Sequence, residues 1–164
     1  MKKLGFGIVG CGTVSTWHAQ SVKAIEGTYL AGVTDVNKNT RDQFAKKYGV
    51  RSYDNYEHML QQNDIDVVSI CTPSGLHAPL AIQAAKAGKH IIVEKPMALN
   101  VKEADTMIEA CEQNNVKLAV ISQLRFSDAT TRLKGALDEG LLGKLLVGTL
   151  SMKYYRSQEY YDQS

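Results

Sequence analysis

The residues best suited to chemistry follow three short apolar runs, at the points where buried strands would end. Cys71 to His77 follows one run, Glu94-Lys95-Pro96 follows the next, and Gln123 to Phe126 follows the third. The carboxyl ends of parallel strands meet at one edge of a sheet, and ligands of open α/β folds bind there. We therefore expect a ligand site at that edge, built from these three stretches.

A glycine-rich turn is the second chemical feature. Gly10-Cys11-Gly12-Thr13-Val14-Ser15 lies where the first apolar run passes into a helical pattern. Glycines at such a corner let the backbone turn sharply and let a pyrophosphate approach the helix N-terminus. The predicted cofactor-binding residues of this turn are Gly10, Gly12, Thr13 and Val14.

An acidic residue supports a dinucleotide at this turn. Asp35 ends the second strand-like run and lies 23 residues after Gly12, close to the ~20-residue spacing at which a carboxylate accepts hydrogen bonds from the adenosine ribose. An acid there opposes a 2′-phosphate and favours NAD, although Lys38 and Arg41 follow closely and leave NADP open. The alternative is an ordinary strand-to-helix turn in which Asp35 caps the next helix.

Short β-branched runs alternate with longer helix-period segments from the N-terminus to about Ser122. This alternation predicts βαβ units, and so an α/β fold of the Rossmann type: a doubly wound parallel sheet with helices on both faces. The expected strands are Leu4–Val9, Tyr29–Thr34, Val50–Tyr53, Val67–Ile70, His90–Val93 and Lys117–Ile121.

The last forty residues have a different pattern. A helix is expected from about Asp128 to Gly140, followed by a strand over Lys144–Tyr154. We predict a dinucleotide-binding domain over residues 1–125, and a connector helix with the first strand of a truncated α+β antiparallel-sheet domain over 126–164. Because such a strand has nothing to pair with, we expect the chain to be the front half of a longer protein.

Composition excludes several classes of protein. The chain has 164 residues, of which 44% are hydrophobic and 22% charged, with a net charge of +2. No run approaches the ~18 apolar residues of a membrane span, and the dispersed charges predict no nucleic-acid partner. The three cysteines and four histidines lack metal-ligand spacing, so no metal is expected. Cysteine usage favours a reducing compartment, and hence the cytoplasm.

Taken together, the glycine turn, the Thr72-Pro73 to His77 stretch and Glu94-Lys95-Pro96 resemble the Gfo/Idh/MocA oxidoreductases, over the whole chain. The resemblance implies a Rossmann domain followed by an open-faced antiparallel sheet that binds substrate. It also implies NAD(P)-dependent hydride transfer at a secondary hydroxyl of a sugar or nucleotide-sugar, and a homo-oligomer.

The tail over residues 154–162 looks most like that of enzymes that oxidise the C3 hydroxyl of UDP-linked N-acetylated glucuronic acid. A downstream Asp and His complete the catalytic site of the family. Because these residues lie beyond the last residue of this chain, we expect the chain to be inactive alone.

The resemblance implies a role for each matched residue. Lys95 would be catalytic, taking or sharing the hydroxyl proton, and would also lie at the cofactor. Further cofactor contacts would come from Thr72, Pro73, His77, Glu94 and Arg125, and substrate contacts from Arg156 and Tyr160.

Alternatives stay open at this point. Lys95 fits a surface lysine, His77 a helix-start residue, and Arg125 an ion pair with Asp128. The whole chain also fits a non-catalytic NAD-binding sensor or regulatory module, since the fold alone does not specify catalysis. A nucleotide-sugar-binding subunit is a third reading.

Overall fold

The structure is a computed structural model that describes residues 3–162, apart from the side chain of Tyr160. The chain divides into two compact units, Met1–Ile121 and Ser122–Ser164. Each unit is described by itself.

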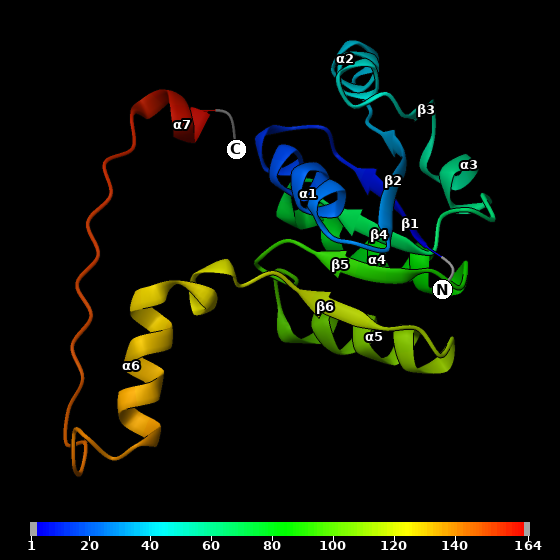
Figure 1. Cartoon of the computed structure of the whole chain (residues 1–164). Coiled ribbons are helices and arrows are strands. Elements are labelled where there is room, and N and C mark those ends of the chain that lie inside the picture. The colour runs from blue at the N-terminus through cyan, green and yellow to red at the C-terminus, as the bar shows by residue number, and fades with distance from the viewer. Residues whose placement is uncertain (1–2, 163–164) are drawn as a thin grey trace. The chain divides into compact units, whose positions relative to one another are not determined.

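Six parallel strands form the sheet of the first unit (Figure 1). In chain order they are β1 (Leu4–Val9), β2 (Thr28–Thr34), β3 (Arg51–Tyr53), β4 (Val67–Ile70), β5 (His90–Val93) and β6 (Leu118–Val120). Their order across the sheet is β3-β2-β1-β4-β5-β6. The direction of strand addition therefore reverses between β1 and β4, which is the point where open α/β sheets form a ligand crevice.

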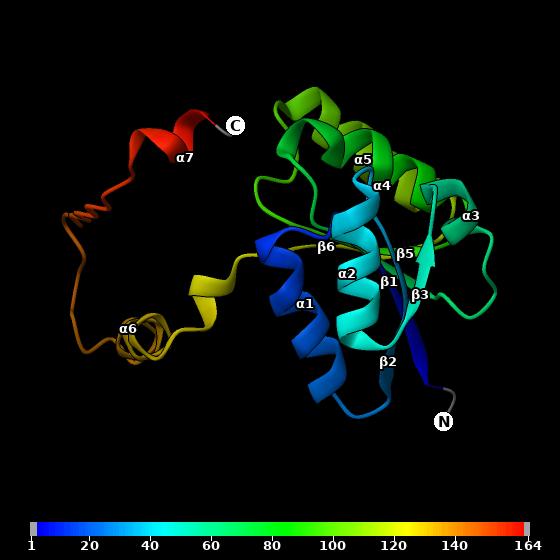
Figure 2. The same ribbon diagram turned by 90° about the horizontal axis from the view of Figure 1, so that it is seen from above.

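Helices cover both faces of this sheet (Figure 2). One face carries α1 (Thr13–Ala24) and α2 (Lys38–Tyr48), and the other carries α3 (Tyr56–Leu60), α4 (His77–Lys86) and α5 (Val101–Gln113). Strands buried on both faces have near-continuous apolar sequences, and β4 is buried throughout. The predicted doubly wound α/β fold is confirmed, and each of the six strands expected before Ser122 agrees with the structure to within one residue at either end.

The second unit contains a short 3-10 helix at Gln123–Phe126, α6 (Asp128–Asp138) and α7 (Gln158–Asp162). The expected strand over 144–154 is wrong, because this segment has no regular secondary structure. A strand is held by hydrogen bonds to a neighbouring strand, and the described residues of this unit contain no strand with which the segment could pair. Leu146 and Val147 accordingly remain exposed.

No helix in the described part of the chain combines the length and the apolar character that crossing a membrane requires.

Candidate dinucleotide site

Gly10 and Gly12 have different structural roles in the turn after β1. Gly10 has a φ of +87°, and a Cβ on it would lie 2.7 Å from the carbonyl oxygen of Cys71. Only glycine therefore lets the end of β1 approach the end of β4 so closely. Gly12 has a φ of −77° at the N-cap of α1, and a Cβ there would meet no atom within 4 Å. Gly12 thus leaves open space at the helix N-terminus.

The N-terminus of α1 is suited to an anion. No side chain caps the helix and its first turn has no acidic residue, while Thr13 and Val14 are exposed. Unpaired backbone N–H groups and the helix dipole favour negative charge at such an end. Ser15 is fully buried and its hydroxyl donates to the Gly12 carbonyl, so a small residue occupies the position where α1 packs closely on the sheet.

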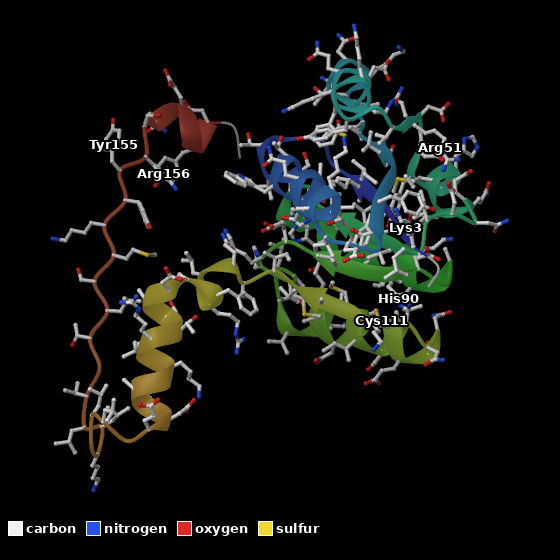
Figure 3. All side chains as sticks on the ribbon, viewed as in Figure 1. Lys3, Arg51, His90, Cys111, Tyr155 and Arg156 are labelled. Carbon is white, nitrogen blue, oxygen red and sulfur yellow. The ribbon has the colours of Figure 1, made fainter. Side chains whose placement is uncertain are left out.

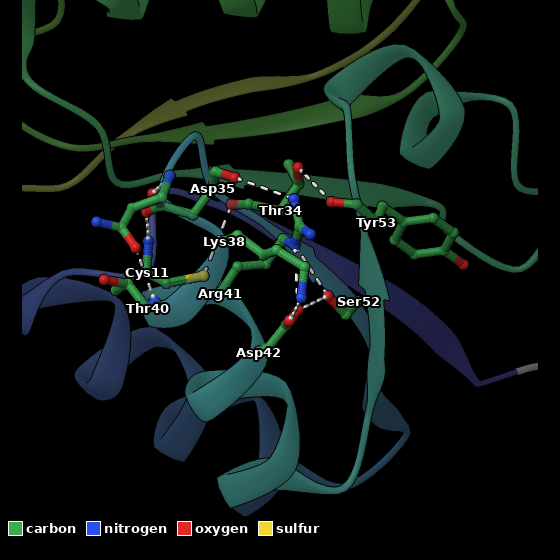
Figure 4. Close-up of polar contacts among 10 residues, drawn as sticks. Cys11, Thr34, Asp35, Lys38, Thr40, Arg41, Asp42, Ser52 and Tyr53 are labelled. Carbon is green, nitrogen blue, oxygen red and sulfur yellow. Dashed lines mark hydrogen bonds and ion pairs between the residues drawn. The ribbon is translucent and has the colours of Figure 1, made fainter.

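Asp35 directly follows β2 beside this turn, and its carboxylate is held by backbone groups (Figure 4). Oδ2 accepts a hydrogen bond from the Cys11 N–H at 2.7 Å, and Oδ1 accepts one from the Asn37 N–H at 2.7 Å. A carboxylate has about four acceptor sites, so Asp35 can still accept bonds from ribose hydroxyls. Asn37, not Asp35, caps α2, accepting from the Thr40 N–H at 3.1 Å. The capping alternative for Asp35 is therefore wrong.

The two cationic residues near Asp35 are paired with another carboxylate. Lys38 Nζ donates to Asp42 Oδ2 at 2.7 Å, and Arg41 Nε lies 3.0 Å from Ser52 Oγ and 3.4 Å from Asp42 Oδ1. Hydrogen bonds from Lys38 first, and then from Ser52, lower the pKa of Asp42 to about 2. Asp42 is therefore ionised at neutral pH and offsets positive charge that would otherwise attract a 2′-phosphate.

His77 joins the chain after β4 to the chain after β5. Its side chain is buried, with Nδ1 2.7 Å from the Pro96 carbonyl oxygen and Nε2 2.9 Å from the Thr72 carbonyl oxygen. Both ring nitrogens therefore face protein acceptors. His77 holds two chain segments of the sheet edge together and has no ring nitrogen left for a ligand.

The hydroxyl of Thr72 is buried and has no hydrogen-bond partner among the described residues. Buried polar groups usually have a partner, so this oxygen is suited to a ligand or a water molecule at the end of β4. Pro73, the next residue, is exposed.

Glu94 and Lys95 extend from the end of β5. The Glu94 N–H donates to the Ile70 carbonyl at 3.1 Å, and Glu94 Oε2 accepts from the Lys95 N–H at 3.2 Å. The Lys95 side chain is exposed, and no hydrogen bond or ion pair among the described residues holds its ammonium group. The backbone here is fixed, while the amine stays available to a ligand.

His18 also lies at this edge, although the motifs in the sequence did not mark it as a site residue. Its Nε2 lies 2.9 Å from Glu94 Oε1, and its Nδ1 lies 2.5 Å from Ser69 Oγ. The helical spacing contained a signal, because His18 lies three residues after Ser15 and next to Ala19, both fully buried. That spacing places His18 on the side of α1 that faces the sheet.

The other expected ligand residues lie in the second unit. Arg125 is exposed in the 3-10 helix and makes no ion pair with Asp128 among the described contacts. Arg156 lies on the segment before α7 (Figure 3), with its guanidinium 5.6 Å from the centre of the Tyr154 ring. The side chain of Tyr160 is outside the described residues.

We expect Cys11 and Cys71 to resist alkylation in the native protein. Burial raises the pKa of each thiol to about 12, so little of the reactive thiolate exists at neutral pH. The pKa of each thiol is higher in the folded state than the value near 9 expected in the unfolded state. The resulting contribution to the stability of the fold is therefore fully present below pH 9 and is lost as the pH rises from 9 toward 12. Iodoacetamide labelling with mass spectrometry, in buffer and in urea, tests this expectation. Equal labelling rates in the two conditions would contradict it.

These features define a Rossmann-type dinucleotide-binding protein. They are the reversal of the strand order, the glycine turn at a helix N-terminus suited to an anion, and the carboxylate at the end of β2. Residues 4–122 match a family model described as an oxidoreductase family with an NAD-binding Rossmann fold. The chain belongs to this family, Gfo/Idh/MocA, and residues 4–122 form its NAD-binding Rossmann fold.

Similar proteins include dehydrogenases of polyols and sugars. The chain is 32% identical over 139 residues to myo-inositol 2-dehydrogenase of Thermotoga maritima, covering 84% of this chain and 42% of that protein. It is 30% identical over 146 residues to glucose-6-phosphate 3-dehydrogenase of Bacillus subtilis, covering 89% and 41%.

Among solved structures, the WlbA dehydrogenase from Bordetella pertussis in complex with NADH and UDP-GlcNAcA superimposes with a TM-score of 0.94 at 33% identity, covering 99% of this chain and 47% of that one. The chain thus spans less than half the length of these relatives.

Proposed function

We propose that the protein transfers a hydride between NAD and a secondary hydroxyl of a sugar or nucleotide-sugar. The observation that carries this proposal is the exposed amine of Lys95 at the carboxyl end of β5, which pairs with none of the described residues and extends from a backbone held by Glu94. Sugar and polyol dehydrogenases among the relatives support the reaction class. The complex of WlbA with UDP-GlcNAcA favours a nucleotide-linked uronic sugar as substrate.

The order of the strands suggests which residues would contact each part of the cofactor. Asp35 at β2 would accept hydrogen bonds from the adenosine ribose, and the open N-terminus of α1 at Gly12, Thr13 and Val14 would hold the pyrophosphate. The ends of β4 and β5 lie farther along the same edge, so Thr72, Pro73 and Glu94-Lys95 would surround the nicotinamide half. NAD, when bound, supplies the hydride acceptor.

Lys95 would handle the proton of the reacting hydroxyl. An amine within hydrogen-bond reach of the hydroxyl can share or take its proton, and its ammonium form can stabilise the alkoxide that develops. Glu94 would hold the backbone from which Lys95 extends. His77, bonded to two carbonyl groups, would keep the chain segments after β4 and β5 together.

The second unit would supply contacts to the substrate. Arg125 and Arg156 carry planar guanidinium groups that suit a phosphate or carboxylate, and Tyr160 would line the sugar. We also propose that the protein forms a homo-oligomer. Because the chain spans less than half of its relatives, turnover would need a substrate-binding part of the kind that their additional length supplies.

Activity is best tested on a chain of the length of its relatives. The chain would be mixed with NAD and, separately, with a UDP-linked N-acetylated uronic sugar, inositol or glucose 6-phosphate, and the appearance of NADH followed by its absorbance. We expect NADH to form with the nucleotide-sugar. Binding of NADH without oxidation of any hydroxyl compound would instead favour a sensor module.

We expect Asp35→Asn to weaken NADH binding on the order of tenfold or more, because the amide replaces a charged acceptor of ribose hydroxyls. The amide also keeps only one of the two oxygens that now accept from the Cys11 and Asn37 N–H groups. Calorimetric titration of the present chain measures the change.

Asp54→Asn is the matched control, since Asp54 is exposed and its carboxylate contacts only the exposed His58 among the described ion pairs. Equal NADH affinity in Asp35→Asn and the unaltered chain would show that Asp35 does not face the ribose.

A further inference from the structure

The contacts of His18 join three elements of the first unit. His18 lies in the second turn of α1, its Nδ1 is 2.5 Å from the hydroxyl of Ser69 in β4, and its Nε2 is 2.9 Å from Glu94 Oε1 after β5. The side chains of His18 and Glu94 are 10% and 14% exposed, and Ser69 is 1% exposed. Water therefore competes little for these hydrogen bonds.

The chemistry of the partners determines where the ring carries its proton. An ionised carboxylate only accepts hydrogen bonds, so Nε2 must be the donor to Glu94. In a neutral ring Nδ1 then accepts from the Ser69 hydroxyl, and in a charged ring Nδ1 donates to the same oxygen. The bond to Glu94 exists in both forms, and Glu94, which can only accept, selects the neutral tautomer with its proton on Nε2.

Glu94 carries this constraint to Lys95. One carboxylate oxygen accepts from His18, and the other accepts from the Lys95 N–H at 3.2 Å. The N–H of Glu94 is itself held by Ile70 in β4. The carboxylate therefore links α1 to the backbone from which the Lys95 amine projects.

We propose that His18 is a positioning residue, which fixes the Glu94 carboxylate and through it the Lys95 backbone relative to the helix that receives the pyrophosphate. This inference rests on the proposed function of Lys95 at the nicotinamide half of the site. The alternative is that His18 only fastens α1 to the sheet. The two roles of His18 differ in the part of the cofactor whose binding affinity they would change.

The test compares, in the present chain, the whole cofactor with ADP-ribose, which lacks only the nicotinamide ring. Calorimetry would give the Kd of NADH and of ADP-ribose for the unaltered protein, His18→Leu, His18→Gln and the control His58→Leu, which removes an exposed histidine paired with Asp54. We expect His18→Leu to raise the Kd of NADH on the order of tenfold and to change that of ADP-ribose by less than about twofold. His18→Gln, which keeps an N–H donor, should recover part of the NADH affinity, and His58→Leu should match the unaltered protein.

A second measurement needs no variant. Nitrogen NMR of the histidine rings should show the neutral His18 ring with its proton on Nε2. A neutral ring with its proton on Nδ1 would overturn the inference, as would equal losses of NADH and ADP-ribose affinity in His18→Leu, or no loss of either. If the unaltered protein bound ADP-ribose but gained no affinity from the nicotinamide ring, the proposed function would fail and this role of His18 with it.

Discussion

Replacing Lys95 by alanine should lower kcat about 10²- to 10⁴-fold, the usual contribution of a general acid or base, and should change the Kd of NADH by less than about threefold. The Lys95 amine makes no hydrogen bond or ion pair among the described residues, and the side chain is exposed. Its removal therefore leaves no buried partner unsatisfied, and we expect the free energy of unfolding to stay the same. Steady-state kinetics on a chain of the length of its relatives measures kcat, and titration measures the NADH affinity.

Lys86→Ala is the matched control, because Lys86 is also exposed and lies in the last turn of α4. Lys95→Arg is expected to be nearly as slow as Lys95→Ala, since an arginine keeps the charge but does not release a proton. Unchanged kcat in Lys95→Ala would remove Lys95 from the reaction. A protein that binds NADH and shows no turnover before or after the substitution would fit the sensor module.

Gly10→Ala and Gly12→Ala should have different effects, the first on the stability of the protein and the second on its affinity for NADH. Gly10→Ala should lower the free energy of unfolding by at least about 2 kcal/mol, because an alanine is strained at a φ of +87° and its methyl group would lie 2.7 Å from the Cys71 oxygen. Gly12→Ala should change the stability by less than about 0.5 kcal/mol, since the added methyl group meets open space. The same methyl group lies where the pyrophosphate would approach, so NADH affinity should fall on the order of tenfold.

Urea unfolding followed by circular dichroism gives the stability of both variants, and NADH titration gives their affinities. Equal midpoints for Gly10→Ala and the unaltered chain would show that the ends of β1 and β4 can separate without loss. Unchanged NADH affinity in Gly12→Ala would mean that the cofactor does not approach this helix end.

The features that depend on residues close together in the chain could be predicted from the sequence. Strands such as Val67–Ile70 were predictable because a strand buried on both faces must be apolar almost throughout. The turn after Val9 was predictable because glycine is required where the backbone adopts a positive φ. The spacing of Asp35 from that turn then indicated a dinucleotide, since one βαβ unit sets both positions.

The side-chain contacts across the sheet edge could not be predicted in this way, because they depend on how the whole chain folds. The bonds of His18 to Ser69 and Glu94 join residues separated by 51 and 76 positions, and no local pattern specifies such pairs. His77 is similar, because the carbonyl group of Pro96 that engages it comes from a different strand end.

The wrong strand over 144–154 has the same cause. Its residues have the apolar character of a strand, but strand formation depends on hydrogen bonds to a partner, and the described residues of the second unit contain none. Hydrophobic periodicity and turn residues can be read from consecutive residues. Strand pairing, side-chain contacts and the burial of polar groups depend instead on which distant segments lie next to one another in the folded chain.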